Sequence, residues 1–165
     1  MDNDPEFLAV LARAKNILDQ TRATPTEYID NNLKNHFIER LRVTFEELAK
    51  YRLKKNSLGY VEYSKLLMVH REMPRVVADM NRRFIAAEIE RCNDLFNDID
   101  GKSLDEQQRE AVVTDELNNL VIAGAGSGKT LTISAKVNYL CEKRDIHQMK
   151  YFLLHSPRKR LCEPA

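Results

Sequence analysis

One stretch decides the fold, and it reads NLVIAGAGSGKT over residues 119–130. Its first half, residues 119–123, is a short apolar run without polar alternation, which is typical of a strand buried on both faces of a parallel sheet. Its second half is rich in glycine and leads into residues 132–141, where apolar residues recur at helical spacing. The pattern predicts a strand, a tight loop and a helix in succession.

The glycine-rich half is a phosphate-binding loop with alanine where the strict pattern has glycine. Glycines let backbone N–H groups turn toward an anion, and the helix N-terminus adds partial positive charge. Lys129 then supplies a charge to the β and γ phosphates, and the Thr130 hydroxyl supplies a ligand to Mg²⁺. The predicted cofactors are therefore ATP and Mg²⁺. The predicted nucleotide-binding residues here are Ala123, Gly124, Ala125, Gly126, Ser127, Gly128, Lys129 and Thr130.

A fortuitous glycine turn is the competing explanation of this loop. A string that satisfies its four constrained positions arises by chance in roughly 1% of chains of this length. The strand-like run before the loop and the helical pattern after it are the context that a true phosphate loop requires. A second apolar run, residues 151–154, predicts another strand and completes a β-loop-α-β unit.

Long apolar stripes at helical spacing dominate the first hundred residues. The second stripe begins at the capping sequence TPTE, Thr24–Glu27, and a similar sequence at Ser103–Glu106 predicts a short helix that ends at Val113. Such stripes usually form a helical core, although an exposed stripe would indicate a partner-binding face. We expect helices over residues 7–18, 24–51, 60–73, 74–96 and 103–113.

Composition excludes several classes of protein. The 165 residues carry a net charge of +1, which gives no overall field for steering toward nucleic acid. The three cysteines have no CxxC pair and the four histidines share no ligand spacing, so neither a disulfide framework nor a metal centre is indicated. No apolar run approaches the roughly 18 residues that a membrane span requires. We expect a cytoplasmic protein that does not bind membranes.

Two motifs together carry a resemblance to a known family. Residues 104–112 read LDEQQREAV, and AGAGSGKT follows at residues 123–130. Together they resemble the Q motif and the Walker A motif of the UvrD/Rep family of superfamily 1 DNA helicases, although Asp105 and Leu131 depart from the usual pattern. The resemblance implies that Gln108 reads the adenine edge through an amide that both donates and accepts hydrogen bonds.

The family resemblance also implies a fold and an activity. We expect an α/β fold that is mostly helical: a helical extension, residues 1–100, followed by the truncated start of a RecA-like ATP-binding domain, residues 101–165. Full-length relatives use ATP hydrolysis to move 3′ to 5′ along single-stranded or partly duplex DNA. The family's next motif is degenerate here, as HSPRKRLCEPA, with Arg158 and Lys159 matching its basic DNA-contacting positions.

Later helicase motifs, including the Mg²⁺-binding carboxylates and the arginine fingers, do not follow Thr130 in this sequence. We therefore expect a truncated or frameshifted helicase, or an excised helicase segment, that binds ATP but does not unwind DNA alone. Two alternatives remain open. One is a helical partner-binding module with a relic nucleotide loop, and the other is a small nucleotide-dependent regulator that hydrolyses nothing. The sequence identifies no protein partner.

Overall fold

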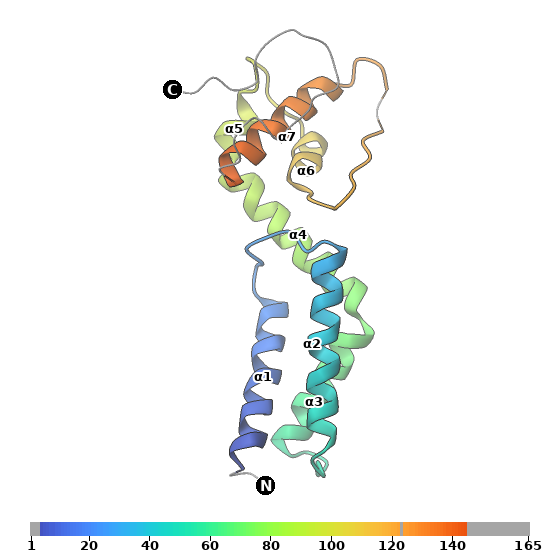
Figure 1. Cartoon of the computed structure of the whole chain (residues 1–165). Helices are drawn as coiled ribbons and strands as arrows, with labels where there is room; N and C mark the ends of the chain where they lie inside the picture. The colour runs from blue at the N-terminus through green and yellow to red at the C-terminus, as the bar shows by residue number, and fades with distance from the viewer. Residues whose placement is uncertain (1–3, 123, 145–165) are drawn as a thin grey trace. The chain divides into compact units, whose positions relative to one another are not determined.

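The computed structural model describes residues 4–122 and 124–144, and the helices in this part of the chain are shown in Figure 1. Packing divides the chain into two compact units, Met1–Phe84 and Ile85–Ala165. The domain boundary expected near residue 100 stays a prediction. The helices are α1 (Pro5–Arg22), α2 (Asn31–Ala49), α3 (Leu58–Arg71), α4 (Met73–Arg91), α5 (Asn93–Asn97), α6 (Glu106–Val113) and α7 (Lys129–Arg144).

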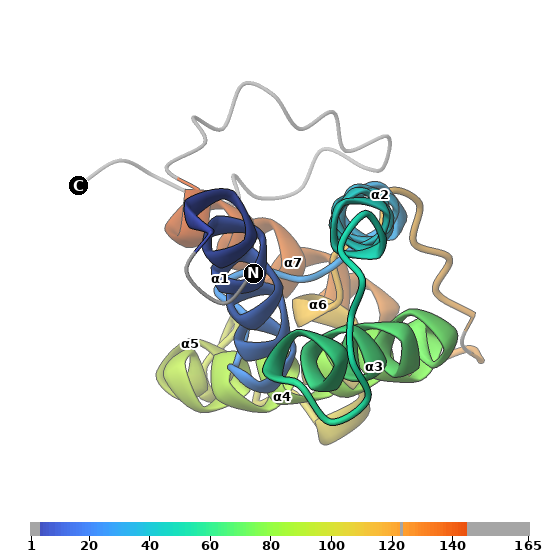
Figure 2. The ribbon, with the colours of Figure 1, turned by 90° about the horizontal axis from the view of Figure 1, so that it is seen from below.

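The first unit is a bundle in which α1, α2 and α3 pack against one another. Figure 2 looks along this bundle from the end at which α2 connects to α3. Ala14, Ile17, Leu41 and Leu66 are each fully buried at the centre. The expected apolar stripes therefore form core, except that the solvent-facing Leu8 and Leu33 are 46% and 37% exposed.

The start of α2 differs from the expectation of a helix beginning at Thr24. The helix begins at Asn31, after Asp30, whose carboxylate accepts a hydrogen bond from the Leu33 N–H at 2.8 Å. The preceding segment is held in an irregular conformation by Asn81, whose side-chain amide exchanges two hydrogen bonds with the backbone of Ile29, at 2.8 and 3.1 Å. This long-range partner outweighs the local capping sequence, and no pattern in residues 24–27 could reveal it.

The second unit is built on α5, α6 and α7, with Phe96, Ile99, Val112, Val113 and Tyr139 in its core. Its backbone reverses direction at Asp98–Lys102, where Asp100 and Gly101 have φ values of 54° and 76°. Ile99 and Lys102 exchange both backbone hydrogen bonds across the turn, at 2.8 and 3.1 Å. Two successive positive φ values define a type I′ turn, which favours an Asp-Gly pair.

The structure does not show the strand that the sequence predicted at residues 119–123. Residues 119–122 have no regular secondary structure, no strand occurs among the described residues, and Ala123 lies outside them. Leu120 and Ile122 are 85% and 87% exposed. A strand persists only when neighbours pair with its N–H and C=O groups, and the described part of the chain supplies none.

The mostly helical character is confirmed for the described residues, whereas the sheet of the expected α/β fold is not found in them. The second predicted strand, residues 151–154, lies outside the described residues. No described helix combines the length and the apolar character that crossing a membrane would need.

Candidate nucleotide-binding site

The loop before α7 has a backbone that only glycine adopts without strain at two positions. Gly126 and Gly128 have φ values of 77° and 79°, in the left-handed region. The Ser127 hydroxyl donates to the Gly124 carbonyl at 2.8 Å, and the Ser127 N–H approaches the same oxygen at 3.4 Å. These contacts close the loop into a tight turn directly before the first residue of α7. The glycine spacing read from the sequence therefore matches a real conformational requirement.

Lys129 lies at the first position of α7 and turns back over the loop. Its ammonium Nζ donates to the Gly124 carbonyl at 2.6 Å, and the side chain is exposed to solvent. The first N–H groups of a helix lack partners within the helix, and they carry partial positive charge. A cation and a helix N-terminus thus converge on one small region. Thr130, the predicted Mg²⁺ ligand, is the next residue and is also exposed.

Gln108 connects the α6 N-terminus to this loop. Its side-chain Oε1 accepts from the Asp105 N–H at 3.1 Å, while the Asp105 carboxylate accepts from the Gln108 N–H at 2.8 Å. These reciprocal bonds form a capping box, so the predicted box at Ser103–Glu106 is wrong by two residues. The Gln108 Nε2 then donates to the Ser127 carbonyl at 3.2 Å. A Cβ added to Gly128 would lie 2.7 Å from this nitrogen.

A lysine on α7 fixes the other end of α6. The Lys136 Nζ donates to the carbonyls of Val112 and Thr114 at 2.8 and 2.7 Å, and it lies 3.6 Å from an Asp115 oxygen. Val112 lies in the last turn of α6 and Thr114 is its C-cap, where a helix has acceptors without internal partners. Lys136 therefore joins the helix that carries Gln108 to the helix that carries Lys129. Lys136 could not be found from the sequence, because the carbonyls that it holds are backbone atoms without a sequence signature.

Arg109 holds the segment before α6 in place. Its guanidinium donates to the Leu104 carbonyl at 2.9 Å and to the Asn97 side chain at 2.7 Å. It also donates to Asn93 at 3.0 Å and lies over the Phe96 ring. The planar fork of arginine suits several simultaneous acceptors, so this side chain orders the backbone that leads to Gln108.

A polar cluster of Tyr139, Glu88 and Arg91 anchors α7 in the second unit. The Tyr139 hydroxyl donates to Glu88 at 2.8 Å, and Arg91 holds the same carboxylate through two hydrogen bonds at 2.8 and 3.0 Å. Burial and the Glu88 carboxylate raise the pKa of Tyr139 above its usual value. Tyr139 is 2% exposed, so the phenol acts as a neutral hydrogen-bond donor in the core.

Other predicted site residues have different outcomes. Ala123, Arg158 and Lys159 lie outside the described residues. Among residues 4–122 and 124–144, no group of three or more His, Cys, Asp or Glu side chains could hold a metal ion. Magnesium binding by Thr130 remains a prediction.

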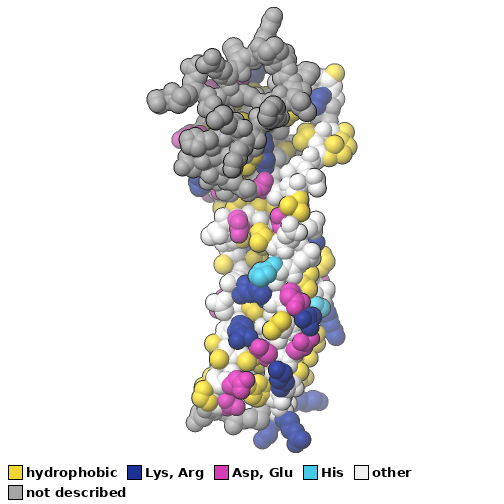
Figure 3. Space-filling view, in the orientation of Figure 1, with side chains coloured by type: hydrophobic (Ala, Val, Ile, Leu, Met, Phe, Trp, Pro, Cys, Tyr) yellow, Lys and Arg dark blue, Asp and Glu magenta, His cyan; other side chains and the backbone are white. Residues whose placement is uncertain are grey.

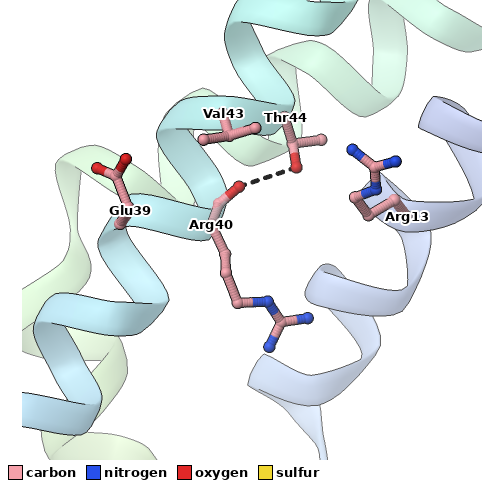
Figure 4. A pocket seen from close by; sticks show the side chains of 5 residues that line it. All are labelled: Arg13, Glu39, Arg40, Val43 and Thr44. Carbon is pink, nitrogen blue, oxygen red and sulfur yellow. Dashed lines mark hydrogen bonds between the residues drawn. The ribbon is translucent and has the colours of Figure 1, made fainter.

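A shallow pocket of about 170 Å³ lies elsewhere, between α1 and α2 in the first unit (Figure 4). It is lined by Arg13, Glu39, Arg40, Val43 and Thr44. The Thr44 hydroxyl donates to the Arg40 carbonyl at 2.9 Å within α2, so it is satisfied locally. Arg13 makes an ion pair with Glu47. The pocket therefore presents no convergent set of available polar groups.

Comparison with known proteins supports the resemblance seen in the sequence. Residues 104–155 match the profile of the UvrD/REP helicase N-terminal domain. Over 79 residues the chain is 33% identical to DNA helicase IV of Escherichia coli (strain K12), an alignment that covers 48% of this chain. The aligned part spans 12% of the length of that relative. No solved structure matches the chain. The similarity to UvrD-like helicases is thus confirmed for the segment that contains Gln108 and the loop.

Proposed function

We propose that this chain binds Mg-ATP at the loop Gly124–Thr130 and forms the nucleotide-binding beginning of a UvrD-like ATP-dependent DNA helicase. The observation that carries the proposal is the position of Lys129. Its ammonium group lies over the loop, 2.6 Å from the Gly124 carbonyl, beside the exposed N-terminus of α7. A lysine in this place can exchange one carbonyl for the more highly charged oxygens of a triphosphate.

Each neighbouring residue has a defined part in this proposal. The loop N–H groups hold the phosphates, and the Thr130 hydroxyl holds the Mg²⁺ that ATP brings. Gln108 offers an amide to the adenine and also donates to the Ser127 carbonyl. One side chain therefore both recognises the base and contacts the loop. Bound Mg-ATP supplies the phosphoryl group whose transfer to water would drive movement along DNA.

Hydrolysis and unwinding belong to residues beyond this site. Phosphoryl transfer requires carboxylates that hold the metal and a group that orients the attacking water. Residues 4–122 and 124–144 contain no acidic cluster of that kind. We propose that the chain alone binds ATP without unwinding DNA, and that 3′ to 5′ movement on single-stranded DNA requires the remaining motor. Arg158 and Lys159 are the proposed DNA contacts of this segment.

Calorimetric titration of Mg-ATP into the purified chain tests the proposal. We expect saturable binding that Lys129→Ala abolishes and that Lys102→Ala, which removes the same charge from an exposed turn, leaves unchanged. Absence of binding by the unaltered folded protein, or equal loss in both variants, would overturn the proposal.

A second pair of variants tests the loop geometry. Gly128→Ala introduces a Cβ 2.7 Å from Gln108 at a φ of 79°, so we expect weaker ATP binding. Gly101→Ala provides the matched control, because it has a similar φ of 76° with no atom within 4 Å of the added Cβ. If both alanine variants bind ATP as tightly as the parent protein, the contact between Gln108 and the loop has no part in binding.

The alternative function, a helical partner-binding module, loses its main support. It requires an exposed apolar stripe at Phe37, Leu41 and Phe45. Leu41 is fully buried, and both phenylalanines are partly buried against the same core. These three residues therefore pack against the core of the first unit.

A further inference from the structure

Four cations lie close together in the connection between α2 and α3, and the proposed function does not use them. They are Lys50, Arg52, Lys54 and Lys55, which we call the basic tip. All four side chains are exposed, and Figure 3 shows Lys and Arg side chains projecting from the end of the first unit. No Asp or Glu occurs between Glu47 and Glu62 in the sequence.

The two residues interleaved with these cations anchor the connection to the core. The Tyr51 ring packs edge-on against Phe7, with the ring centroids 5.0 Å apart. Leu53 packs beside Gly59 so closely that a Cβ at that glycine would lie 2.9 Å from the leucine side chain. Both anchors are partly buried in the same core cluster. Alternate burial therefore turns the charged residues outward.

Backbone hydrogen bonds further restrict the same connection. The Leu53 N–H donates to the Tyr51 carbonyl at 2.8 Å, which closes a three-residue turn around Arg52. The Ser57 N–H donates to the Lys54 carbonyl at 3.0 Å, and the Ser57 hydroxyl caps α3. A backbone held at both ends presents its side chains with less loss of conformational entropy on binding.

The basic tip also lacks the ion pairs that other cations of the first unit make. Some arginine and lysine side chains elsewhere in this unit form ion pairs with carboxylates, namely Arg13, Arg42, Lys65 and Arg82. No ion pair within the described residues involves Lys50, Arg52, Lys54 or Lys55.

Three carboxylates act electrostatically on Tyr51, but among the described residues none of them forms an ion pair with a cation of the basic tip. Burial, followed by the charges of Glu6, Asp4 and Glu47, raises the pKa of Tyr51, so these carboxylates lie on its side of the connection. The Asp4 carboxylate accepts from the Glu6 N–H at the start of α1, and Glu47 makes its ion pair with Arg13. The four cations of the basic tip are exposed to solvent.

We propose that the basic tip binds the phosphodiester backbone of DNA. Clustered, unpaired cations neutralise successive phosphates and release their counterions, and this gives affinity without reading sequence. The choice of DNA as the polymer rests on the proposed helicase function, whereas the site itself lies outside the nucleotide loop. The helical extension would then have a DNA-binding site of its own, separate from the nucleotide loop.

Fluorescence anisotropy with a labelled single-stranded oligonucleotide, in a salt series without ATP, tests this inference on the full chain. A double variant, Arg52→Ala with Lys54→Ala, removes two phosphate contacts of about 0.7 each from the salt slope of log K. We expect the slope to become shallower by about 1.4 and low-salt affinity to fall at least about fivefold. Lys15→Ala with Arg75→Ala makes the same charge change at exposed helix positions, and we expect it to bind as the parent does.

The proposal would be overturned by absence of DNA binding by the parent, by an unchanged salt slope in the tip variant, or by an equal loss in the control. Polyglutamate of matched charge serves as a competitor, and displacement as effective as that by unlabelled DNA would also contradict phosphate recognition. Because no nucleotide is present, failure of ATP binding leaves these outcomes readable.

Discussion

Removal of the Lys136 ammonium group should lower the stability of α6 and show how strongly the candidate site depends on this lysine. Lys136→Met keeps most of the aliphatic stem and deletes two hydrogen bonds, to the carbonyls of Val112 and Thr114. Each of these hydrogen bonds contributes about 1 kcal/mol net, because water can replace part of it at the end of a helix. The pair with Asp115 is partly exposed and adds about 0.5 kcal/mol or less. We expect a loss of about 2 kcal/mol.

Native-state hydrogen exchange of the α6 amides measures this loss directly. A decrease of about 2 kcal/mol in the opening free energy accelerates exchange roughly 30-fold. Lys102→Met is the matched control, since it makes the same change at an exposed position. Unchanged exchange in α6 after Lys136→Met, or equal acceleration in the control, would refute the role assigned to Lys136. Weaker ATP binding should accompany faster exchange, because α6 carries Gln108.

Two further predictions concern the cores of the two units. Tyr139 keeps its proton in the folded protein at a pH where the unfolded chain, with an ordinary tyrosine pKa of about 10, loses it. The unfolding free energy should therefore fall as the pH rises above about 10, and urea denaturation should show a smaller fall for Tyr139→Phe; identical profiles would contradict this. Leu41→Ala, at a fully buried position, should cost about 3 kcal/mol in thermal denaturation, whereas Leu33→Ala, 37% exposed, should cost less than about 1 kcal/mol. Similar losses would show that Leu41 is not central to the core.

Periodic patterns predicted the helices better than their ends. The face of α2 that carries Leu41 and Leu48 follows directly from spacing, because helical periodicity is a local property. The start of α2 could not be predicted from spacing, because it depends on Asn81, which is 52 residues from its partner Ile29. The expected single helix over residues 74–96 also breaks, at Cys92, into α4 and α5. Its apolar stripe continues across the break, so spacing alone conceals it.

The candidate site divides in the same way. Positive φ values at Gly126 and Gly128 were foreseeable, because glycine at those positions is itself the signal. The roles of Lys136 and Arg109 were not foreseeable, because both side chains donate hydrogen bonds to carbonyls and amides that carry no sequence signature. The strand at residues 119–123 shows the reverse case: its apolar pattern is clear, but strand formation depends on partners elsewhere.

Leu120 and Ile122 have a consequence for handling the protein. The segment from residue 117 to 128 contains no charged residue and no proline. Its large apolar side chains, Leu117, Leu120, Val121 and Ile122, are exposed to water. Such a segment is a template for pairing with the same segment of another molecule, and neighbouring charges normally oppose that pairing. Self-association through this short stretch should therefore limit the concentration at which the chain stays monomeric, and one lysine in place of Leu120 should raise that limit.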